Sequence, residues 1–272
     1  MDKPSASSSQ PSERDFLWLH LRELPYFRAL LRAVEARFYQ GLHLPHPILD
    51  IGCGDGHFAS VTFDEPLDVG LDPDPRVLPL ARGYGGYRWV LRGYGDALPF
   101  GRATFASAVS NSVLEHIPDI DNVLCEVARV LRPGAPFIFC VPNHRFAPSL
   151  SVVRFFERLG WCGLANAYQR FFNRISRHYH CDDVPRWQER LERAGFTLEN
   201  YWHYFSPGAL ACLEWGHYFG LPSLVWRKLT GKWILAPYPW NLALTRRVVQ
   251  PYFDQPAECA NGVYTFYIAR RS

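Results

Sequence analysis

Short apolar runs and stretches with helical periodicity alternate along the first half of the chain. Runs that are almost entirely apolar lie at residues 46–53, 67–73, 87–93, 105–111 and 135–143. Such runs predict strands that are buried on both faces of a sheet. Residues 196–205 and 262–271 predict a sixth and a seventh strand. The intervals between the runs are long enough for helices, so consecutive strands are expected to be parallel.

The helical stretches are marked by their apolar faces and by their ends. In residues 13–40 apolar side chains recur on one face, and Pro25 predicts a break between two helices. Residues 119–131 are amphipathic and stop at an Arg-Pro-Gly turn. The helix that follows the first strand is expected to be short, because Pro66 comes soon after it. Together these elements predict an α/β fold with a parallel sheet covered by helices on both faces.

Three segments fall outside this alternation. Residues 1–12 are polar and rich in Ser and Pro, which predicts a disordered tail before a single domain over 13–272. Residues 144–181 look helical and aromatic, and residues 206–260 form a long connection between the last two predicted strands. Long connections inside a compact domain usually have a task. We therefore expect both segments to be functional insertions.

Composition and charge exclude several classes of protein. The formal net charge is only +3, too small to indicate a nucleic-acid-binding protein. The seven cysteines are scattered, with no Cys-x-x-Cys pair, which argues against a disulfide framework and a zinc site and predicts a reducing, cytoplasmic location. Residues 200–226 carry few charges but contain His, Pro and Gly, so we do not expect them to span a membrane.

The first predicted strand ends in a glycine-rich turn, "LDIGCGDG", at residues 49–56. Glycines at such a point let a ligand approach bare backbone, and Asp72 ends the second strand at the spacing from which an acid accepts ribose hydroxyls. "GDGHFA" at 54–59 also fits the dinucleotide pattern, which keeps a nicotinamide or flavin enzyme open. Asp50 would repel a pyrophosphate and would suit an ammonium or sulfonium group.

Several stretches in the right order resemble one family. "ILDIGCGDG", "GDALPF" at 95–100 and the continuous stretch at 110–143 resemble the class I S-adenosylmethionine-dependent methyltransferases of the type 11 family. The resemblance covers roughly residues 46–143 and recurs weakly at 186–196. It implies a Rossmann-like, seven-stranded, mostly parallel sheet whose last strand is antiparallel, with the helical, aromatic-rich segments as additions. It also implies S-adenosylmethionine as the cofactor.

The resemblance further implies where the cofactor is held. The glycine loop would approach the methionine part, Asp50 would lie near its amino group, and Asp72 would accept the ribose hydroxyls. Ser110 and Asn111, directly after the fourth strand, would lie beside the sulfonium.

At the other end of the cofactor, Asp96 and the backbone of Ala97 would hold the adenine edge, and Pro73 and Leu98 would sandwich the ring. The complete set of cofactor-binding residues that we expect is Asp50, Gly52, Cys53, Gly54, Gly56, Asp72, Pro73, Asp96, Ala97, Leu98, Ser110 and Asn111.

Methyl transfer needs a base only if the acceptor must lose a proton. His116 and His144 are the catalytic candidates, with His178 and His180 in "RHYHCDD" behind them, and a packing role is the alternative for each. The same stretch hints at metal ligands, but a dense local cluster seldom closes a coordination shell alone. We therefore predict no metal site and expect Asp182 or Asp183 to cap the next helix.

The sequence therefore predicts a methyltransferase that acts on an oxygen, nitrogen or carbon atom of a small-molecule or lipid-like acceptor. A nicotinamide-dependent oxidoreductase and a catalytically silent S-adenosylmethionine-binding module are the alternatives. Residues 206–260, with Trp215, Trp226, Trp233 and Trp240, are expected to cover the acceptor site. Peripheral contact with a membrane and a homodimer interface are the other interpretations of that segment.

Overall fold

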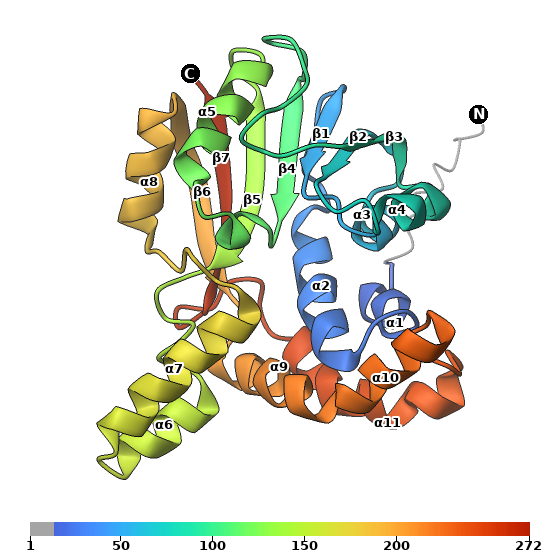
Figure 1. Cartoon of the computed structure of the whole chain (residues 1–272), viewed down its shortest axis with the longest axis vertical. Helices are drawn as coiled ribbons and strands as arrows, with labels where there is room; N and C mark the ends of the chain where they lie inside the picture. The colour runs from blue at the N-terminus through green and yellow to red at the C-terminus, as the bar shows by residue number, and fades with distance from the viewer. Residues whose placement is uncertain (1–13) are drawn as a thin grey trace, which may run out of the picture.

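A computed structural model describes residues 14–272 of the chain, and the expectation of a tail at residues 1–12 lies outside the described part. Its centre is a seven-stranded sheet in the order β3-β2-β1-β4-β5-β7-β6 (Figure 1). The strands are β1 Ile48–Ile51, β2 Leu67–Asp72, β3 Tyr87–Arg92, β4 Ser107–Asn111, β5 Pro136–Pro142, β6 Phe196–Tyr204 and β7 Tyr264–Arg271. Strand β7 runs antiparallel to both β5 and β6, and the remaining pairs are parallel, which confirms the predicted fold.

Helices pack on both faces of the sheet, and two hydrophobic clusters form between the layers. Neighbouring strand residues point to opposite clusters: Ile48 and Val109 belong to one, and Leu49 and Ala108 to the other. The first face is covered by α1 Phe16–Leu21, α2 Tyr26–Phe38, α3 His57–Thr62 and α4 Leu78–Tyr84. The second is covered by α5 Ile120–Val130 and α8 Val184–Arg193 (Figure 1). Strands β1, β4 and β5 are buried at every position because they lie between both layers.

The two predicted insertions are helical and gather at the carboxyl ends of the parallel strands, in the lower part of Figure 1. They form α6 Ser151–Arg158, α7 Cys162–Ser176, α9 Pro207–Phe219, α10 Leu221–Thr230 and α11 Pro239–Phe253. The same end holds α2 and a short 3-10 helix, Leu114–His116. No helix within residues 14–272 combines the length and the hydrophobicity that crossing a membrane requires.

Helix α9 belongs to the core more than to a cover. Leu210 is fully buried, and α9 packs against α2 and α6. The buried Glu214 accepts hydrogen bonds from the N–H groups of Ser151 and Val152, so it caps the start of α6. Helix α9 nonetheless exposes Trp215 and Phe219 on its outer side, so the exposed part of residues 206–260 begins within its second half.

Candidate functional site

The glycine loop leaves β1 at the carboxyl edge of the sheet and is tied to β2. The N–H groups of Gly52 and Cys53 donate to the Leu71 carbonyl at 2.8 and 3.0 Å. All three glycines have positive φ, with values of 82° at Gly52, 54° at Gly54 and 81° at Gly56. This is the left-handed region that favours glycine, so the loop conformation depends on these residues.

The three glycines differ in what surrounds them. A Cβ at Gly52 would lie 2.4 Å from Val113 Cγ1, and one at Gly56 would lie 2.7 Å from the Cα of Ala81. A Cβ at Gly54 would meet no atom within 4 Å. Gly52 and Gly56 thus serve the packing of the protein itself, whereas Gly54 faces open space in which a ligand can lie against the backbone.

Asp72 stands at the end of β2, beside this open space. Its Oδ2 accepts from the Gly54 N–H at 2.9 Å, and its Oδ1 accepts from the Asp74 N–H at 2.9 Å. Each carboxylate oxygen can accept a second hydrogen bond, and the side chain is partly exposed. The carboxylate is therefore held in a fixed orientation with acceptor capacity left for a pair of hydroxyls.

A cavity of about 690 Å³ opens between the glycine loop and the helices at this end of the molecule. Its lining combines residues of the glycine loop, α3, the loop after β2 and α4 with arginines of α2, of α10 and of the C-cap of α7. The lining residues are Leu24, Arg28, Arg32, Gly54, Asp55, His57, Phe58, Asp74, Arg76, Val77, Leu80, Arg177 and Arg227. The volume lies within the range of small-molecule sites in proteins.

Asp50 lies under the loop, in β1, and is almost fully buried. The Tyr87 hydroxyl donates to its Oδ2 at 2.5 Å. Burial raises the pKa of Asp50 to about 7, against the opposing effects of the Tyr87 hydrogen bond and Arg32. The group thus titrates near neutral pH, and a cationic ligand would favour its ionised form.

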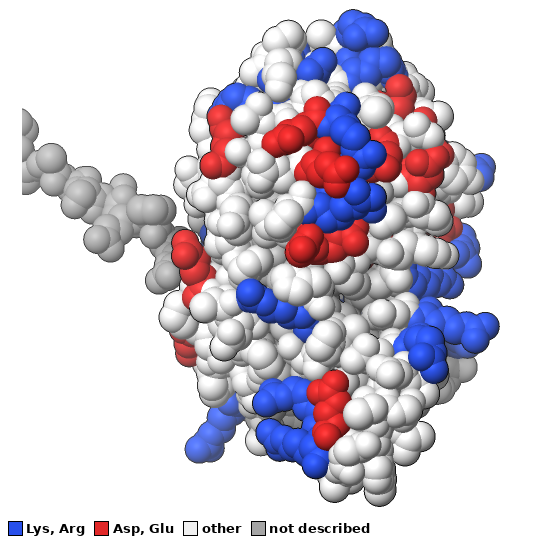
Figure 2. Space-filling view, turned by 90° about the vertical axis from the view of Figure 1, so that its left-hand side faces the viewer, with Lys and Arg blue, Asp and Glu red and all other residues white. Residues whose placement is uncertain are grey.

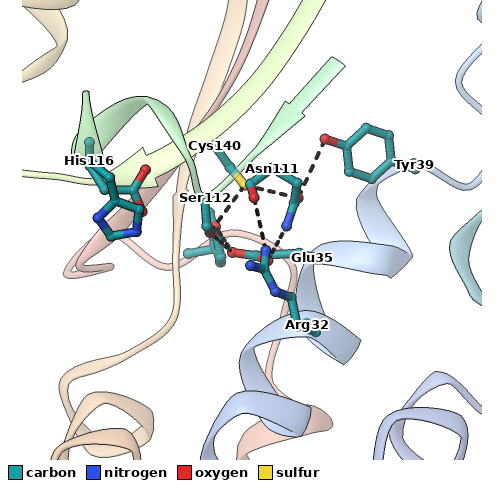
Figure 3. A network of polar contacts seen from close by, with 9 residues as sticks. Arg32, Glu35, Tyr39, Asn111, Ser112, His116 and Cys140 are labelled. Atoms are coloured by element: carbon teal, nitrogen blue, oxygen red, sulfur yellow. Dashed lines mark hydrogen bonds and ion pairs between the residues drawn. The ribbon is translucent and has the colours of Figure 1, made fainter. Parts of the chain in front are cut away.

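A buried polar network joins α2 to the end of β4 (Figure 3). The Glu35 side chain is fully buried and accepts from Asn111 Nδ2 at 2.6 Å, from Ser112 Oγ at 2.8 Å and from the Tyr204 hydroxyl at 2.9 Å. Arg32 pairs with Glu35 at 3.1 Å and also donates to the Asn111 carbonyl at 3.0 Å. The network therefore fixes the backbone that follows β4, next to the glycine loop.

This network changes what is expected of Ser110 and Asn111, the last two residues of β4. The Asn111 side chain is used within the network, where its Oδ1 also accepts from Cys140 Sγ and the Tyr39 hydroxyl. The Ser110 side chain is fully buried, and its hydroxyl donates to the Ile51 carbonyl at 2.8 Å. Both side chains hold strands and α2 together, so any contact of theirs with a cofactor would come from the backbone.

The residues expected at the adenine end lie on the loops after β2 and β3. Pro73, Asp96 and Ala97 are exposed there. Leu98 is buried in the hydrophobic cluster under α5, and its N–H donates to Glu126 Oε2 at 2.9 Å. The Leu98 side chain thus packs in the core, while its neighbours remain accessible at the edge of the sheet. Cys53 is likewise buried, with its Sγ against the Gly54 carbonyl.

His116 lies in a cluster of three groups from two distant segments. Its Nδ1–H donates to the Arg177 carbonyl at 3.1 Å, so its Nε2 carries the lone pair, and this atom lies 3.7 Å from Glu115 Oε1. His178 is the third member, and the candidate ligand atoms of the three residues lie within 4.8 Å of one another. The predicted candidate His144, by contrast, is exposed on the loop after β5.

Burial shifts the pKa values of all three residues in this cluster. Burial raises the pKa of Glu115 to about 8 and lowers the pKa of His178 to about 3. Burial also lowers the pKa of His116. The Glu115 Oε2 and His178 Nδ1 atoms have no hydrogen-bond partner. At neutral pH the cluster is therefore uncharged, and it contains two buried polar atoms without a hydrogen-bond partner among the described residues.

Glu115, Arg32 and Glu35 were not expected from the sequence to form part of the site. Glu35 had a detectable signal, because it occupies the fourth position after Leu31 on the apolar face of its helix, where a charge is unusual. Asp183, as expected, caps α8 by accepting from the Arg186 N–H. His180 donates from Nε2 to the Pro118 carbonyl and pairs with Asp182 through its other nitrogen.

Comparisons with known proteins agree with this geometry. A family model described as "Methyltransferase domain" matches residues 49–139. An uncharacterized methyltransferase of Mycobacterium sp. (strain JLS) is 37% identical over 91 residues, which make up 32% of this chain and 35% of that protein. The chain thus spans about a third of the length of this relative. A demethylmenaquinone methyltransferase of Tropheryma whipplei (strain Twist) is 28% identical over 183 residues, 63% of this chain and 74% of the relative.

Solved structures share the fold. An S-adenosylmethionine-dependent methyltransferase from Mesorhizobium loti superimposes with a TM-score of 0.53 and 17% identity, covering 90% of this chain and all of that one. The glycine loop and Asp72 lie within the part of the chain that the family model matches. Residues 49–139 of this chain are thus similar to a methyltransferase-domain family, and the chain shares its fold with S-adenosylmethionine-dependent methyltransferases of known structure.

Proposed function

We propose that this protein transfers a methyl group from S-adenosylmethionine to an oxygen, nitrogen or carbon atom of a small-molecule or lipid-like acceptor. The observation that carries the proposal is the Asp72 carboxylate, oriented by the N–H groups of Gly54 and Asp74 at the open edge of the sheet. An acid in this position suits the two hydroxyls of a ribose. The family match over residues 49–139 supports the same cofactor.

The residues of the loop fit this cofactor. Gly54 leaves room beside the backbone, Asp72 offers acceptors for the ribose, and Asp50 offers a carboxylate to the ammonium group. Exposed Asp96 and Ala97 would hold the adenine edge, with Pro73 beside the ring. When bound, S-adenosylmethionine supplies a methyl group on a sulfonium, which is already activated for transfer. The task of the protein is then to position the acceptor and to exclude water.

For an acceptor that must lose a proton, His116 is the base we propose. Its tautomer is fixed by the Arg177 carbonyl, which leaves Nε2 free to accept a proton. Arg177 also lines the cavity beside the glycine loop, so the base lies next to the space for the acceptor. Glu115 lies 3.7 Å from the same nitrogen, and above its pKa of about 8 the ionised carboxylate would stabilise the imidazolium.

Replacement of Asp72 tests the proposed cofactor directly. We expect Asp72→Ala to weaken S-adenosylmethionine binding by roughly tenfold or more, because each hydrogen bond to a charged group contributes about 1.5–3 kcal/mol. Calorimetry should compare S-adenosylmethionine with NAD, which would bind instead if the loop served an oxidoreductase. Asp121→Ala, on the exposed start of α5, is the matched control. Unchanged affinity in Asp72→Ala would remove this residue from the site.

Cofactor affinity should also depend on pH through Asp50. The folded protein holds the pKa of Asp50 near 7, so its ionised fraction grows as the pH rises through neutrality. Because the ammonium group attracts only the carboxylate, we expect affinity to rise roughly eightfold from pH 6 to pH 7.5. Asp50→Asn should bind more weakly and lose this dependence. A dependence that survives in Asp50→Asn would assign the titration to another group.

The exposed part of residues 206–260 supports a cover over the acceptor. Arg227 of α10 lines the cavity beside the glycine loop, although α10 lies far from that loop in sequence. Helix α9, by contrast, is part of the core, so the cover that we propose is α10 with the loop that follows it.

We expect exchange of α10, residues 221–230, for a Gly/Ser linker of equal length to abolish turnover and to leave cofactor affinity within about twofold. The reason is that α10 contributes to the cavity but to none of the cofactor-binding residues. Turnover is measured with labelled S-adenosylmethionine and fractionated cell extract, and affinity by calorimetry. Full activity of the exchanged protein on a soluble acceptor would contradict the cover.

Contact with a membrane is the second role proposed for this end of the molecule. Leu229 is 72% exposed and Trp240 is 75% exposed, and both lie on the helices of the long connection. Figure 2 shows the left-hand side of Figure 1, away from α10, and its lower part is mostly uncharged and carries more Lys and Arg than Asp and Glu. Exposed tryptophans and cations at the same end of a molecule suit an anionic lipid surface. Flotation of the full chain with anionic liposomes separates this role from a homodimer, which would bury the same residues.

A further inference from the structure

The cavity beside the glycine loop holds more positive charge than its acids balance. Arg28 and Arg32 of α2, Arg177 at the end of α7 and Arg227 of α10 all line it. Of the two acids in the lining, Asp74 is already bound to Arg76, which leaves Asp55. Four arginines thus face one unpaired carboxylate.

Three of these arginines lack an acidic partner among the described residues. Arg32 pairs with the buried Glu35, whereas Arg28, Arg177 and Arg227 form no ion pair with any carboxylate in the described part of the chain. Arg28 and Arg227 instead lie over the same indole, Trp233, with their guanidinium carbons 5.8 and 4.4 Å from the ring centre. The aromatic ring thus brings two cations from distant helices together, without neutralising either.

This arrangement is electrostatically costly when the cavity is empty of anions. Burial within the cavity walls, together with the neighbouring charges of Arg32 and Arg227, lowers the pKa of Arg28 to about 10, while Asp55 acts against this shift. Like charges in a concave, low-dielectric wall focus their field and attract an anion into it. Guanidinium groups match phosphate and carboxylate geometry. The cofactor brings only one carboxylate, so cations remain for a second anion.

An apolar groove adjoins this cavity. The groove has a volume of about 460 Å³ and shares Leu24 with the cavity. Its wall includes Trp226, Leu235 and Leu242, and also Trp233, the ring over which Arg28 and Arg227 lie. A molecule that places an anionic group against those arginines can therefore extend an apolar chain past Leu24 and Trp233 into the groove.

We infer that the methyl acceptor is an anionic amphiphile, with a phosphate or carboxylate held by Arg28, Arg177 and Arg227 and a hydrocarbon chain in the groove. The inference rests on the proposed methyl transfer and names its substrate class. The site that accepts the methyl group then lies near the anion, since the Arg177 carbonyl orients His116 beside the same cavity.

Binding of simple probes tests the inference. The full chain is first saturated with S-adenosylhomocysteine, so that any cationic side chain that binds the carboxylate of the cofactor is already occupied. It is then titrated by calorimetry with decyl phosphate, decanoate, decyltrimethylammonium and inorganic phosphate, below the concentration at which the amphiphiles form micelles. We expect at least one anionic amphiphile to bind roughly tenfold or more tightly than decyltrimethylammonium. The reason is that the trimethylammonium head group cannot accept the charge-assisted hydrogen bonds that the arginines donate.

The titrations with inorganic phosphate and with the cationic amphiphile test the groove and the arginines separately. If inorganic phosphate binds as tightly as decyl phosphate, the groove holds no chain and this half of the inference is wrong. If the cationic amphiphile binds as well as both anionic ones, the arginines do not select the acceptor and the whole inference is wrong. The two anions distinguish a phosphate head group from a carboxylate.

Variants show whether the named arginines are responsible. Arg28→Gln and Arg227→Gln should each weaken binding of the anionic amphiphile roughly tenfold, and Arg227→Lys should retain most of the affinity. Arg102→Gln, an exposed arginine on the β3–β4 loop, is the control. Equal affinity in all variants would overturn the assignment. S-adenosylhomocysteine must still bind each variant. If the unaltered protein does not bind S-adenosylhomocysteine, the proposed function itself is refuted, whatever the amphiphile result.

Discussion

Gly54→Val is expected to abolish cofactor binding while the protein stays folded. A Cβ at this position meets no protein atom within 4 Å, so the added side chain occupies only the space where the ligand would lie. We expect S-adenosylmethionine affinity to fall by at least about a hundredfold, which corresponds to about 2.7 kcal/mol. Calorimetry measures the affinity, and circular dichroism with thermal unfolding reports the fold.

The matched control for this change is Gly41→Val. Gly41 also has positive φ, at 78°, and a Cβ there likewise meets nothing within 4 Å. It follows α2, before the first strand, outside the cavity and the glycine loop. Both variants bear a similar backbone strain of about 1–3 kcal/mol, because a branched side chain disfavours the left-handed region. If Gly54→Val binds as well as Gly41→Val, the glycine serves only the turn.

Glu35→Ala is expected to cause the largest loss of stability of any single change proposed for this protein. The variant leaves Asn111, Ser112 and Tyr204 without their shared acceptor and Arg32 without its ion-pair partner. Removing one member of a buried ion pair costs about 3–5 kcal/mol of the free energy of unfolding. The midpoint of thermal unfolding should fall by about 10 °C.

Two further variants make this result interpretable. Glu157→Ala changes an exposed glutamate of α6 and should leave the unfolding midpoint nearly unchanged. Glu35→Gln keeps an acceptor oxygen but loses the charge opposite Arg32. Its loss of stability should therefore lie between those of Glu157→Ala and Glu35→Ala. A Glu35→Ala variant as stable as Glu157→Ala would show that the network contributes little to the fold.

The fold was largely predictable because its strands are buried on both faces. An apolar run such as 135–143 is favourable only as a strand that is buried between two layers of helices. The short helix after the glycine loop follows from Pro66. The antiparallel direction of the last strand followed from the family resemblance and not from its own residues. The role of α9 was missed, because its apolar residues look alike whether they cover a site or join the core.

The candidate site was predictable where function depends on local backbone. The glycine loop and Asp72 follow from spacing along two consecutive strands. The Glu35 network was not predictable, because its partners come from β4, the loop after it and β6, far away in sequence. Ser110 shows the same limit: sequence places it at the end of a strand, but only the fold decides that its hydroxyl bonds to Ile51.

The position of β7 between β5 and β6 has a consequence for biosynthesis. Within the described residues 14–272, strand β6, at Phe196–Tyr204, pairs only with β7, so residues 205–263 must leave the ribosome before β6 finds this partner. At about 5–20 residues per second this takes roughly 3–12 seconds. Throughout that interval β5 and β6 each present an unpaired edge to other nascent chains. We therefore expect the chain to be most prone to aggregate during translation, when the cofactor-binding half is complete and the sheet is not.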